Sequence, residues 1–145
     1  MFSPYSIHLG EFDESFFGSL EEASEIVEPT IATQSNYHTV FADNEKAGIV
    51  GILKPMTGGV DSGFVQIVLS PYYRGRGLLS KIYELLAETH KLKTLYATIK
   101  KSNGASIRAH EKIGFKILPE GKLKFLRDKK LISDDEVRLE KTYQF

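Results

Sequence analysis

The fold is decided by the stretch Ile67-Val68-Leu69-Ser70-Pro71-Tyr72-Tyr73-Arg74-Gly75-Arg76-Gly77-Leu78-Leu79-Ser80. It starts as an apolar run of strand length, turns at a proline and two glycines, and continues with the spacing of an amphipathic helix. A strand that turns directly into a helix gathers unpaired backbone N–H groups at the positive end of the helix dipole, where phosphate binds. Gly75 and Gly77 remove side chains that would keep an anion from the backbone. Cationic donors are added by Arg74, Arg76 and Lys81. The alternative interpretation of the same residues is an ordinary turn whose arginines are solvated.

The spacing within this turn narrows the choice of phosphate ligand. A P-loop needs a longer loop that ends in Gly-Lys-Ser or Gly-Lys-Thr, which is absent, so a mononucleotide triphosphate is disfavoured. The dinucleotide-binding fingerprint is matched in part, by Gly75 and Gly77, with Ser80 in place of its last glycine. That fingerprint also requires an acid about 20 residues later, at the end of the next strand. Residues 94–101 contain no acid. A nicotinamide cofactor is therefore the weaker interpretation.

Around this turn, the periodicity of the apolar residues predicts one α/β (α+β) domain that spans residues 1–145 and contains a mixed sheet. The length of 145 residues falls in the range of about 100–200 that is expected of one domain. We expect helices at residues 13–28, 78–90 and 105–113, the last ending at the cap residue Gly114. We expect a hairpin of residues 37–42 and 47–53, a central strand at 64–69, and further strands at 94–99, 115–118, 122–126 and 136–143.

The charges are unevenly distributed along the chain. The 19 basic and 19 acidic residues cancel, but residues 1–50 hold nine acids and one base, Lys46, whereas residues 51–145 hold ten acids and 18 bases. A neutral chain therefore has an acidic first third and a basic remainder. There is no apolar run of roughly 18 residues and no secretory signal at the start. We expect a soluble cytoplasmic protein with no membrane partner.

Three other kinds of site are disfavoured by the composition. The absence of cysteine excludes disulfides, thiolate metal sites and a cysteine nucleophile. The histidines, at positions 8, 38, 90 and 110, lack the spacing of metal ligands, so we expect no metal. The basic run 122–130 contains Phe125 and fits the flank of a strand with solvated lysines, so we expect no nucleic-acid partner.

Two motifs of the chain resemble those of a known family. The run from Arg74 to Leu79, Arg-Gly-Arg-Gly-Leu-Leu, is similar to the signature of the GNAT superfamily of acyl-coenzyme A-dependent N-acetyltransferases. That signature has Gln or Arg, two residues, Gly, one residue, and Gly or Ala, so Leu79 departs from it. The run from Asn103 to Phe115 resembles the family's segment of Asn, Ser or Ala three residues later, Tyr four after that, and a final Gly-Phe; His110 stands in place of the Tyr. The element order agrees with the family from about residue 39 to residue 143.

The resemblance implies a three-layer GNAT-like domain. Its mixed, mostly antiparallel twisted sheet would splay between the strands at 64–69 and 94–99 to hold acetyl-coenzyme A (acetyl-CoA). The implied cofactor-binding residues are Ile67, Val68, Leu69, Arg74, Gly75, Arg76, Gly77, Leu78, Leu79 and Ser80, followed by Asn103, Ser106 and His110. The strand backbone and the side chains of Asn103 and Ser106 would meet the pantetheine arm, and the turn would meet the pyrophosphate. Asn103 fits the N-cap of its own helix equally well. We interpret Tyr72 and Tyr73 as core or rim packing.

The activity that the resemblance implies is N-acetyl transfer by a monomer or homodimer. A primary amine would attack the thioester of acetyl-CoA directly, and the backbone N–H of about Val68 or Leu69 would polarise the carbonyl. His110 would donate a proton to the departing thiolate. The alternative for His110 is a histidine on the helix surface that takes no part in proton transfer. The chief alternative function is a non-catalytic acyl-CoA-binding regulatory module.

The general base and the acceptor stay open at this point. The strand at 64–69 contains Gln66 but no carboxylate. Asp61, Glu45 and His38 flank the expected site and are candidates, acting directly or through water. A cationic amine, either a small molecule or a protein lysine or N-terminus, would suit the acidic first third of the chain. The acids of the first predicted helix also fit a solvated helix face.

Overall fold

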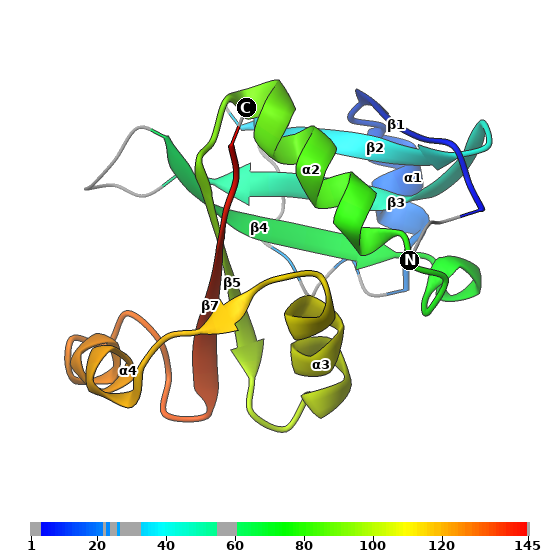
Figure 1. The fold of residues 1–145 in the computed structure, drawn as a ribbon. Helices are drawn as coiled ribbons and strands as arrows, with labels where there is room; N and C mark the ends of the chain where they lie inside the picture. The colour runs from blue at the N-terminus through cyan, green and yellow to red at the C-terminus, as the bar shows by residue number, and fades with distance from the viewer. Residues whose placement is uncertain (1–3, 22, 24–25, 27–32, 55–60, 145) are drawn as a thin grey trace. The chain divides into compact units, whose positions relative to one another are not determined.

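The structure is a computed structural model that describes residues 4–21, 23, 26, 33–54 and 61–144 (Figure 1). The chain divides into two compact units. The first unit consists of Met1–Leu53 and Val65–Lys91, and the second consists of Lys54–Phe64 and Leu92–Phe145. Strand β4 (Ser62–Leu69) passes from the second unit to the first, so neither unit is one continuous segment of the sequence.

The sheet of the first unit has the strand order β1-β2-β3-β4. Antiparallel pairing joins β1 (Ile7–Glu11) to β2 (Tyr37–Ala42), and β2 to β3 (Glu45–Leu53). Asp43 and Asn44 connect β2 and β3 with φ angles of 50° and 70°, and a two-residue type I′ turn requires positive φ at both positions. The hairpin predicted from the sequence is confirmed, with β3 starting two residues earlier than expected.

Helices cover both faces of this sheet. Helix α2 (Leu79–His90) contacts β1 and β3, and α1 (Glu14–Ser19) contacts β3; Figure 1 shows α2 in front of these strands and α1 behind them. The core on the α1 side contains Phe17, Leu20, Tyr37, Ile49 and Val68. Two short 3₁₀ helices, η2 (Gln34–Asn36) and η3 (Pro71–Tyr73), precede β2 and follow β4. The predicted helix at residues 78–90 is confirmed by α2. The apolar stripe that predicted it is the buried face of the helix.

The first helix is shorter than predicted. The Asp13 side chain caps α1, but the helix ends at Ser19, and Leu20 is extended at φ −76° and ψ 132°. The prediction of one helix over residues 13–28 was therefore wrong, because α1 ends at Ser19 and Leu20 is extended. Residues 22, 24, 25, 27 and 28 lie outside the described residues. The backbone N–H groups of Leu20, Ala23 and Ile26 each donate to the carbonyl three residues earlier. The apolar spacing of three fits such successive turns, which an α-helical period of 3.6 resembles over a short window.

The sheet of the second unit has the strand order β4-β5-β7-β6. The start of β4 pairs in parallel with β5 (Thr94–Lys100) over three residue pairs, from Ser62 with Thr94 to Phe64 with Tyr96. β5 pairs along its whole length, antiparallel, with β7 (Glu136–Thr142), which also pairs with β6 (Lys116–Ile117). Helix α3 (Gly104–Lys112) contacts β5 and β6, and Gly114 follows it at φ 103°. The helix and strand predictions for this region are confirmed apart from residues 122–126.

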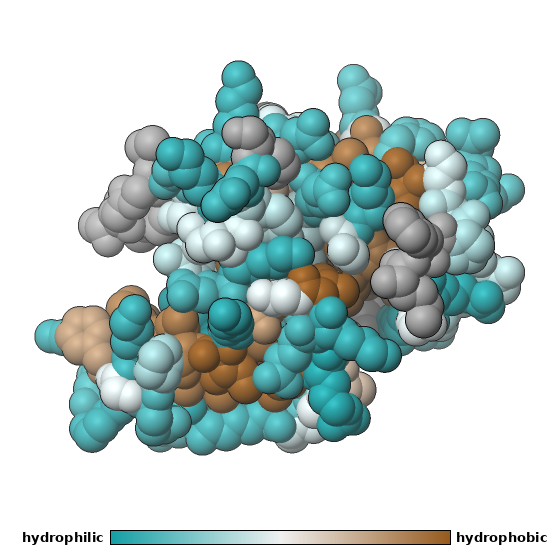
Figure 2. All heavy atoms as spheres, viewed as in Figure 1, coloured by the Kyte–Doolittle hydropathy of each residue, from teal (hydrophilic) through white to brown (hydrophobic). Residues whose placement is uncertain are grey.

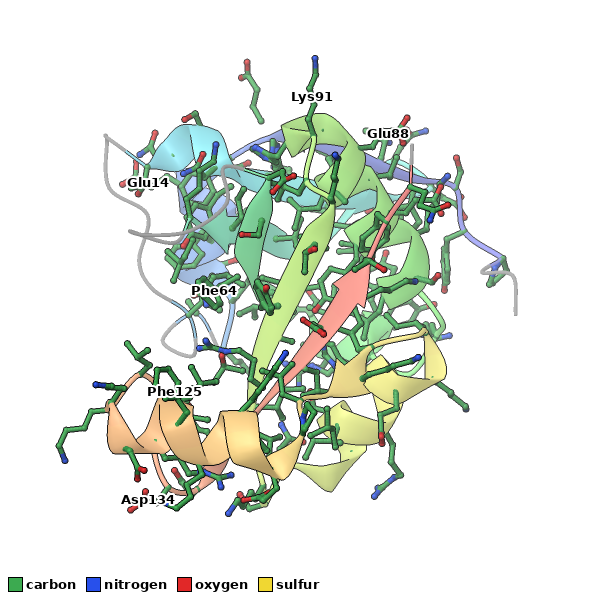
Figure 3. The ribbon with its side chains drawn as sticks, turned by 60° about the vertical axis from the view of Figure 1, so that its left-hand side comes forward. Glu14, Phe64, Glu88, Lys91, Phe125 and Asp134 are labelled. Carbon is green, nitrogen blue, oxygen red and sulfur yellow. The ribbon has the colours of Figure 1, made fainter. Side chains whose placement is uncertain are left out.

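Residues 122–126 form part of a helix and not a strand. Helix α4 (Glu120–Asp128) starts after Pro119, and its last turn contains Arg127. Leu123 is buried, whereas Phe125 is 58% exposed and projects from α4 (Figure 3). Arg127 Nη1 lies 3.0 Å from Glu120 Oε1, and Arg127 Nη2 donates to the Glu136 carbonyl at 2.9 Å. The strand prediction was wrong because the alternation of apolar and basic residues here conceals a helical stripe, in which residues 123, 126 and 127 face inward.

In the described part of the chain, seven strands form a mixed, mostly antiparallel sheet with four α-helices, which confirms the α/β (α+β) prediction. Strand β1 was not predicted. Within the same residues, no helix has the length and apolar character needed to cross a bilayer. Hydrophilic side chains cover most of the face in Figure 2, and the large apolar side chains that stay exposed among the described residues are Tyr72, Ile117, Phe125 and Leu131.

Candidate functional site

The turn before α2 is open and leaves the start of the helix uncapped. Gly75 and Gly77 have φ angles of 68° and 76°, a conformation that side-chain-bearing residues rarely adopt. A Cβ added to either glycine would meet no protein atom within 4 Å. Among the described residues, no side chain caps α2, because the N-cap residue is Leu78, and its first turn has no acid. The first amides of this 12-residue helix are therefore suited to an anion.

Two exposed arginines are tied to the backbone of this turn. Arg74 Nε donates to the Leu69 carbonyl at 3.1 Å. Arg76 Nε donates to the Tyr72 carbonyl, and its guanidinium carbon lies 4.1 Å from the centroid of the Tyr72 ring. Lys81 Nζ lies 3.4 Å from Glu84 Oε1. Both arginines therefore lie beside the uncapped helix start, and their binding of an anion stays a prediction.

The end of β4 that leads into the turn is fixed against β3. Val68 is buried, while Ile67 and Leu69 are partly exposed. A Cβ added to Gly48 of β3 would clash with the Val68 carbonyl oxygen, so the two strands approach closely there. Ser70 N donates to the Ala47 carbonyl at 2.8 Å, directly before the turn. The turn therefore starts from a rigid strand end.

Asn103 and Ser106 lie together at the start of α3 in the second unit. Asn103 Oδ1 accepts a hydrogen bond from Ser106 N at 3.1 Å. This bond confirms the N-cap interpretation of Asn103. Asn103 is exposed and Ser106 is partly exposed. The carbonyl oxygen of the Asn103 amide is therefore used within its own helix, and its NH₂ group is the part suited to a ligand.

His110 is buried and its tautomer is determined by the backbone. Its side chain is 5% exposed, and its ring lies edge-on to Phe115 with centroids 5.2 Å apart. His110 Nδ1 lies 2.8 Å from the Ser106 carbonyl oxygen, which can only accept, so Nδ1 holds the proton of the neutral ring. Burial lowers the pKa of His110, although the bond to Ser106 opposes this effect. The surface position in the alternative for His110 was therefore wrong, while its part in proton transfer stays a prediction. Donation from Nε2 requires the imidazolium form.

The three candidate bases have different surroundings. In the first unit, Glu45 is exposed at the start of β3, and His38 is partly exposed on β2. In the second unit, the Asp61 carboxylate lies 4.0 Å from Lys93 Nζ. Gln66 Nε2 donates to the Val65 carbonyl at 3.3 Å. Asp61 thus belongs to a different compact unit from Glu45 and His38.

His38 is paired with a second histidine. His38 Nε2 lies 2.8 Å from Nε2 of His90, the last residue of α2. The Gly10 backbone also hydrogen-bonds to His38, and the tautomers of the two rings decide which Nε2 atom donates to the other. Burial lowers the pKa of His38, and the bond to Gly10 opposes this effect. No local pattern predicts this contact, because the two residues are 52 positions apart in the sequence.

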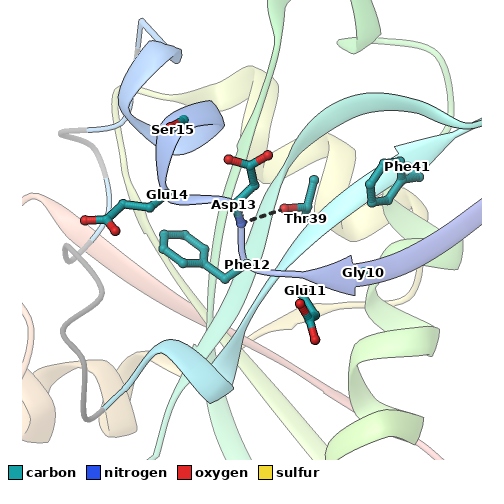
Figure 4. A pocket seen from close by; sticks show the side chains of 8 residues that line it. All are labelled: Gly10, Glu11, Phe12, Asp13, Glu14, Ser15, Thr39 and Phe41. Carbon is teal, nitrogen blue, oxygen red and sulfur yellow. Dashed lines mark hydrogen bonds between the residues drawn. The ribbon is translucent and has the colours of Figure 1, made fainter.

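An open pocket of about 610 Å³ lies where β1 leads into α1 (Figure 4). It is lined by Gly10, Glu11, Phe12, Asp13, Glu14, Ser15, Thr39 and Phe41. Asp13 N donates to Thr39 Oγ1 at 3.0 Å, and Asp13 Oδ2 lies 2.5 Å from Lys46 Nζ. This bond to Lys46 lowers the pKa of Asp13. Glu11 and Glu14 therefore give the pocket its negative charge. The sequence prediction missed this pocket because it missed β1, whose buried Ile7 was the available signal.

Across the ranges that the structure describes, no group of three or more His, Asp or Glu side chains is arranged to hold a metal ion.

The sequence matches a known protein family and curated relatives. A family model described as an acetyltransferase (GNAT) domain matches residues 11–116. The spermidine N(1)-acetyltransferase of Escherichia coli K12 is 30% identical over 115 residues, which cover 76% of this chain and 60% of that protein. The chain thus spans about three fifths of the length of the curated relatives it matches.

Solved structures share the fold. The N-acetyltransferase PseH of Campylobacter jejuni, in complex with acetyl coenzyme A, superposes with a TM-score of 0.64 at 16% identity, covering 96% of this chain and 100% of that one. A Bacillus subtilis acetyltransferase in complex with CoA superposes with a TM-score of 0.65 at 18% identity, covering 97% of this chain and 99% of that one.

Proposed function

The chain belongs to the GNAT acetyltransferase family, and we propose that it is an acetyl-CoA-dependent N-acetyltransferase whose acceptor is a primary amine. The observation on which the proposal rests is the uncapped turn before α2, with two glycines at positive φ and two arginines held beside them. The Campylobacter and Bacillus proteins of the same fold, which are complexes with acetyl-CoA and CoA, support this choice of co-substrate. Bound acetyl-CoA supplies the acetyl group as a thioester.

We assign the pyrophosphate to the turn. The backbone N–H groups from Arg76 to Ser80 and the charges of Arg74 and Arg76 are the donors for it. The pantetheine arm is assigned to the backbone of Ile67–Leu69 and to the first turn of α3 on the family resemblance. Because Asn103 Oδ1 accepts from Ser106 N, Asn103 is assigned to the arm through its NH₂ group.

In the proposed reaction the acceptor nitrogen attacks the thioester carbonyl carbon directly. A C–N bond forms as the C–S bond breaks, one proton leaves the nitrogen, and the departing sulfur gains one proton. The backbone N–H of Val68 or Leu69 polarises the carbonyl, and the alignment of the two reactants provides much of the rate. His110 donates the proton to sulfur from Nε2 as an imidazolium ion, since its neutral tautomer has no proton there. The base is water or one of His38, Glu45 and Asp61.

We propose a cationic amine of the polyamine class as the first acceptor to test. The Escherichia coli relatives are spermidine N(1)-acetyltransferases, which supports a polyamine. Glu11 and Glu14 in the pocket between β1 and α1 supply negative charge suited to a polycation. We also propose that residues 1–145 act as a single transferase domain, because the family match at residues 11–116 includes parts of both compact units.

Binding and turnover test the proposal separately. We expect acetyl-CoA and CoA to raise the melting temperature, and NAD and ATP to leave it unchanged. With spermidine, lysine peptides and peptides with free N-termini as acceptors, thiol release should require both an amine and the enzyme. The protein adds no thiol of its own to this assay because it has no cysteine. Stabilisation by acetyl-CoA without thiol release from any amine would instead support a non-catalytic acyl-CoA-binding module.

A further inference from the structure

We propose that the side chains of Tyr72 and Arg76, named here the Tyr72–Arg76 platform, stack the purine of the coenzyme, an inference that rests on the proposed function. The ligand chemistry is that of the adenosine 3′-phosphate end of CoA. This end is joined to the pantetheine arm through the pyrophosphate that we assign to the neighbouring turn.

The first observation is the exposure of Tyr72. Its side chain is 62% exposed, the largest fraction among the exposed large apolar side chains of the described residues. Of the two sequence interpretations of Tyr72, core packing was therefore wrong, and packing at the rim agrees with its contact to Tyr73. Aromatic rings contribute most to stability when they are buried, so an exposed Tyr72 contributes less to the core than a buried ring would.

The second observation is that the ring, although exposed, is held in one orientation. It packs against Tyr73 in a T-shaped arrangement, with centroids 4.9 Å apart and the ring planes at 81°. Tyr73 is itself packed against Tyr5, with centroids 5.7 Å apart. These contacts limit the motion of the ring, so little entropy is lost when a planar ligand binds beside it.

The third observation is the arginine on one face of this ring. The Arg76 guanidinium carbon lies 4.1 Å from the Tyr72 centroid, and Arg76 Nε donates to the Tyr72 carbonyl. Among the described residues, no carboxylate lies within ion-pair distance of Arg76. A guanidinium held flat offers both a stacking plane for a base and donors for a phosphate, which are the two groups at the nucleotide end of CoA.

The fourth observation is position. Tyr72 lies in η3, and Arg76 lies between the two glycines of the uncapped turn. Phe125 is a matched comparison, since it is 58% exposed and has Lys129 Nζ 5.8 Å from its ring centroid. It lies within α4 of the second unit and not in a glycine turn that leads into a helix. Exposure and a nearby cation are shared by both rings; the adjacent anion site distinguishes Tyr72.

A fluorescent reporter tests the platform directly. The chain contains no tryptophan, so Tyr72→Trp introduces one indole at the platform, and Phe125→Trp introduces one at the comparison position. We expect CoA and adenosine 3′,5′-bisphosphate to quench the Tyr72→Trp indole. Pantetheine, which has no purine, should not quench it, and no ligand should quench the Phe125→Trp indole. Equal quenching in both variants would overturn the platform.

Calorimetry measures the contribution of the ring to affinity. We expect Tyr72→Ala to weaken CoA binding about tenfold and to leave pantetheine binding unchanged, while Tyr72→Phe retains wild-type affinity for both. Phe125→Ala is the control, and the melting temperature checks that each variant is folded. Equal losses for CoA and pantetheine, or unchanged CoA affinity in Tyr72→Ala, would overturn the platform alone. A wild-type protein that does not bind CoA would overturn the proposed function and the platform together.

Discussion

The turn from β4 into α2 and the turn from β5 into α3 both join a strand to a helix, yet only the second closes its own helix end. At α3 the Asn103 side chain accepts a hydrogen bond from Ser106 N. At α2 the corresponding residue is Leu78, which has no group to offer, and the residues before it include two glycines at positive φ. The α3 end is thus satisfied within the protein, whereas the α2 end is arranged for an anion from outside.

The family resemblance implies that residues of both turns bind the cofactor. The difference between the two helix ends separates a stabilising role, at Asn103, from a binding role, at the turn before α2. A cap contributes to the stability of its helix whether or not a ligand is present. An uncapped helix end with backbone in a left-handed conformation is a cost to folding that a bound anion offsets. Substitutions in the α2 turn should therefore affect affinity, whereas substitutions at Asn103 should affect stability through the cap and affinity only through its NH₂ group.

The largest effect is expected for the double substitution Gly75→Val and Gly77→Val. Each valine would have to adopt a left-handed φ, at about 1–2 kcal/mol per residue, and would fill the open space beside the turn. We expect acetyl-CoA affinity to fall by more than about 100-fold in calorimetry. Gly121→Ala is the control, since its added Cβ also meets nothing within 4 Å and Gly121 has no positive φ. A double variant that binds as the wild type does would remove the turn from the site.

A smaller loss is expected for Arg76→Ala. Removing a charged hydrogen bond to phosphate should cost roughly 1–3 kcal/mol of acetyl-CoA affinity, and the melting temperature without ligand should hardly change because Arg76 is exposed. Lys122→Ala removes an exposed charge of the same sign from α4 and serves as the control. Equal effects of the two substitutions would mean that net charge, and not the position of Arg76, governs affinity.

Asn103→Ala should lower stability instead. Loss of the cap should cost about 1 kcal/mol of unfolding free energy in urea titrations, and Asn103→Asp should retain most of it because a carboxylate also accepts from the Ser106 amide. If Asn103 only caps α3, CoA affinity stays unchanged in both variants. A loss of affinity in Asn103→Asp, which keeps the cap but has no NH₂ group, would assign Asn103 to the ligand as well.

The smallest effect is a pH dependence of stability from His38 and His110. The pKa of each is lowered from 6.5 in the folded protein, so the unfolded chain binds more protons below that pH. Stability should be complete above about pH 6.5 and fall as the pH decreases below it, by at most about 1.4 kcal/mol per pH unit for each histidine. Urea titrations between pH 7.5 and pH 5 measure this slope, and His110→Phe should reduce it. An unchanged slope in His110→Phe would mean that this ring is not buried as a neutral group.

His110→Phe also tests the proposed acid. If the imidazolium ion donates to sulfur, wild-type kcat should decrease as the pH rises through the depressed pKa of His110, and the variant should lose this dependence. Full turnover in His110→Phe at every pH would exclude the acid role and leave His110 as a buried residue that supports α3.

The sequence predicted those parts of the fold in which the local pattern and the tertiary contacts agree. In β4 and α2 the apolar residues recur with the period of the element, and Pro71, Gly75 and Gly77 separate the two patterns. The pattern failed at α1 and α4. At α1 a spacing of three residues fits both a helix and successive turns, and at α4 a run of five residues fits both a strand and a helical stripe. In segments this short, only burial against the rest of the unit decides between the two kinds of local structure.

The same distinction applies to the candidate site. The anion turn could be predicted because all its parts are neighbours in the sequence. The contact of His38 with His90, and the pocket that includes Gly10 and Thr39, depend on strand pairing between distant residues. The burial of His110 was missed because its ring packs against Phe115 and bonds to the Ser106 carbonyl, contacts that the helix and the following turn create together.

The passage of β4 through both units has a consequence for synthesis on the ribosome. All residues of the first unit have been made once Lys91 has been added, so β1 to β4 and α2 are then available to fold together. The second unit has to wait for β7, because β5 and β6 both pair with β7. Strand β4, which belongs to both units, is thus synthesised early. When β5 follows, its three residue pairs with the start of β4 form on a strand whose other end already belongs to the first unit.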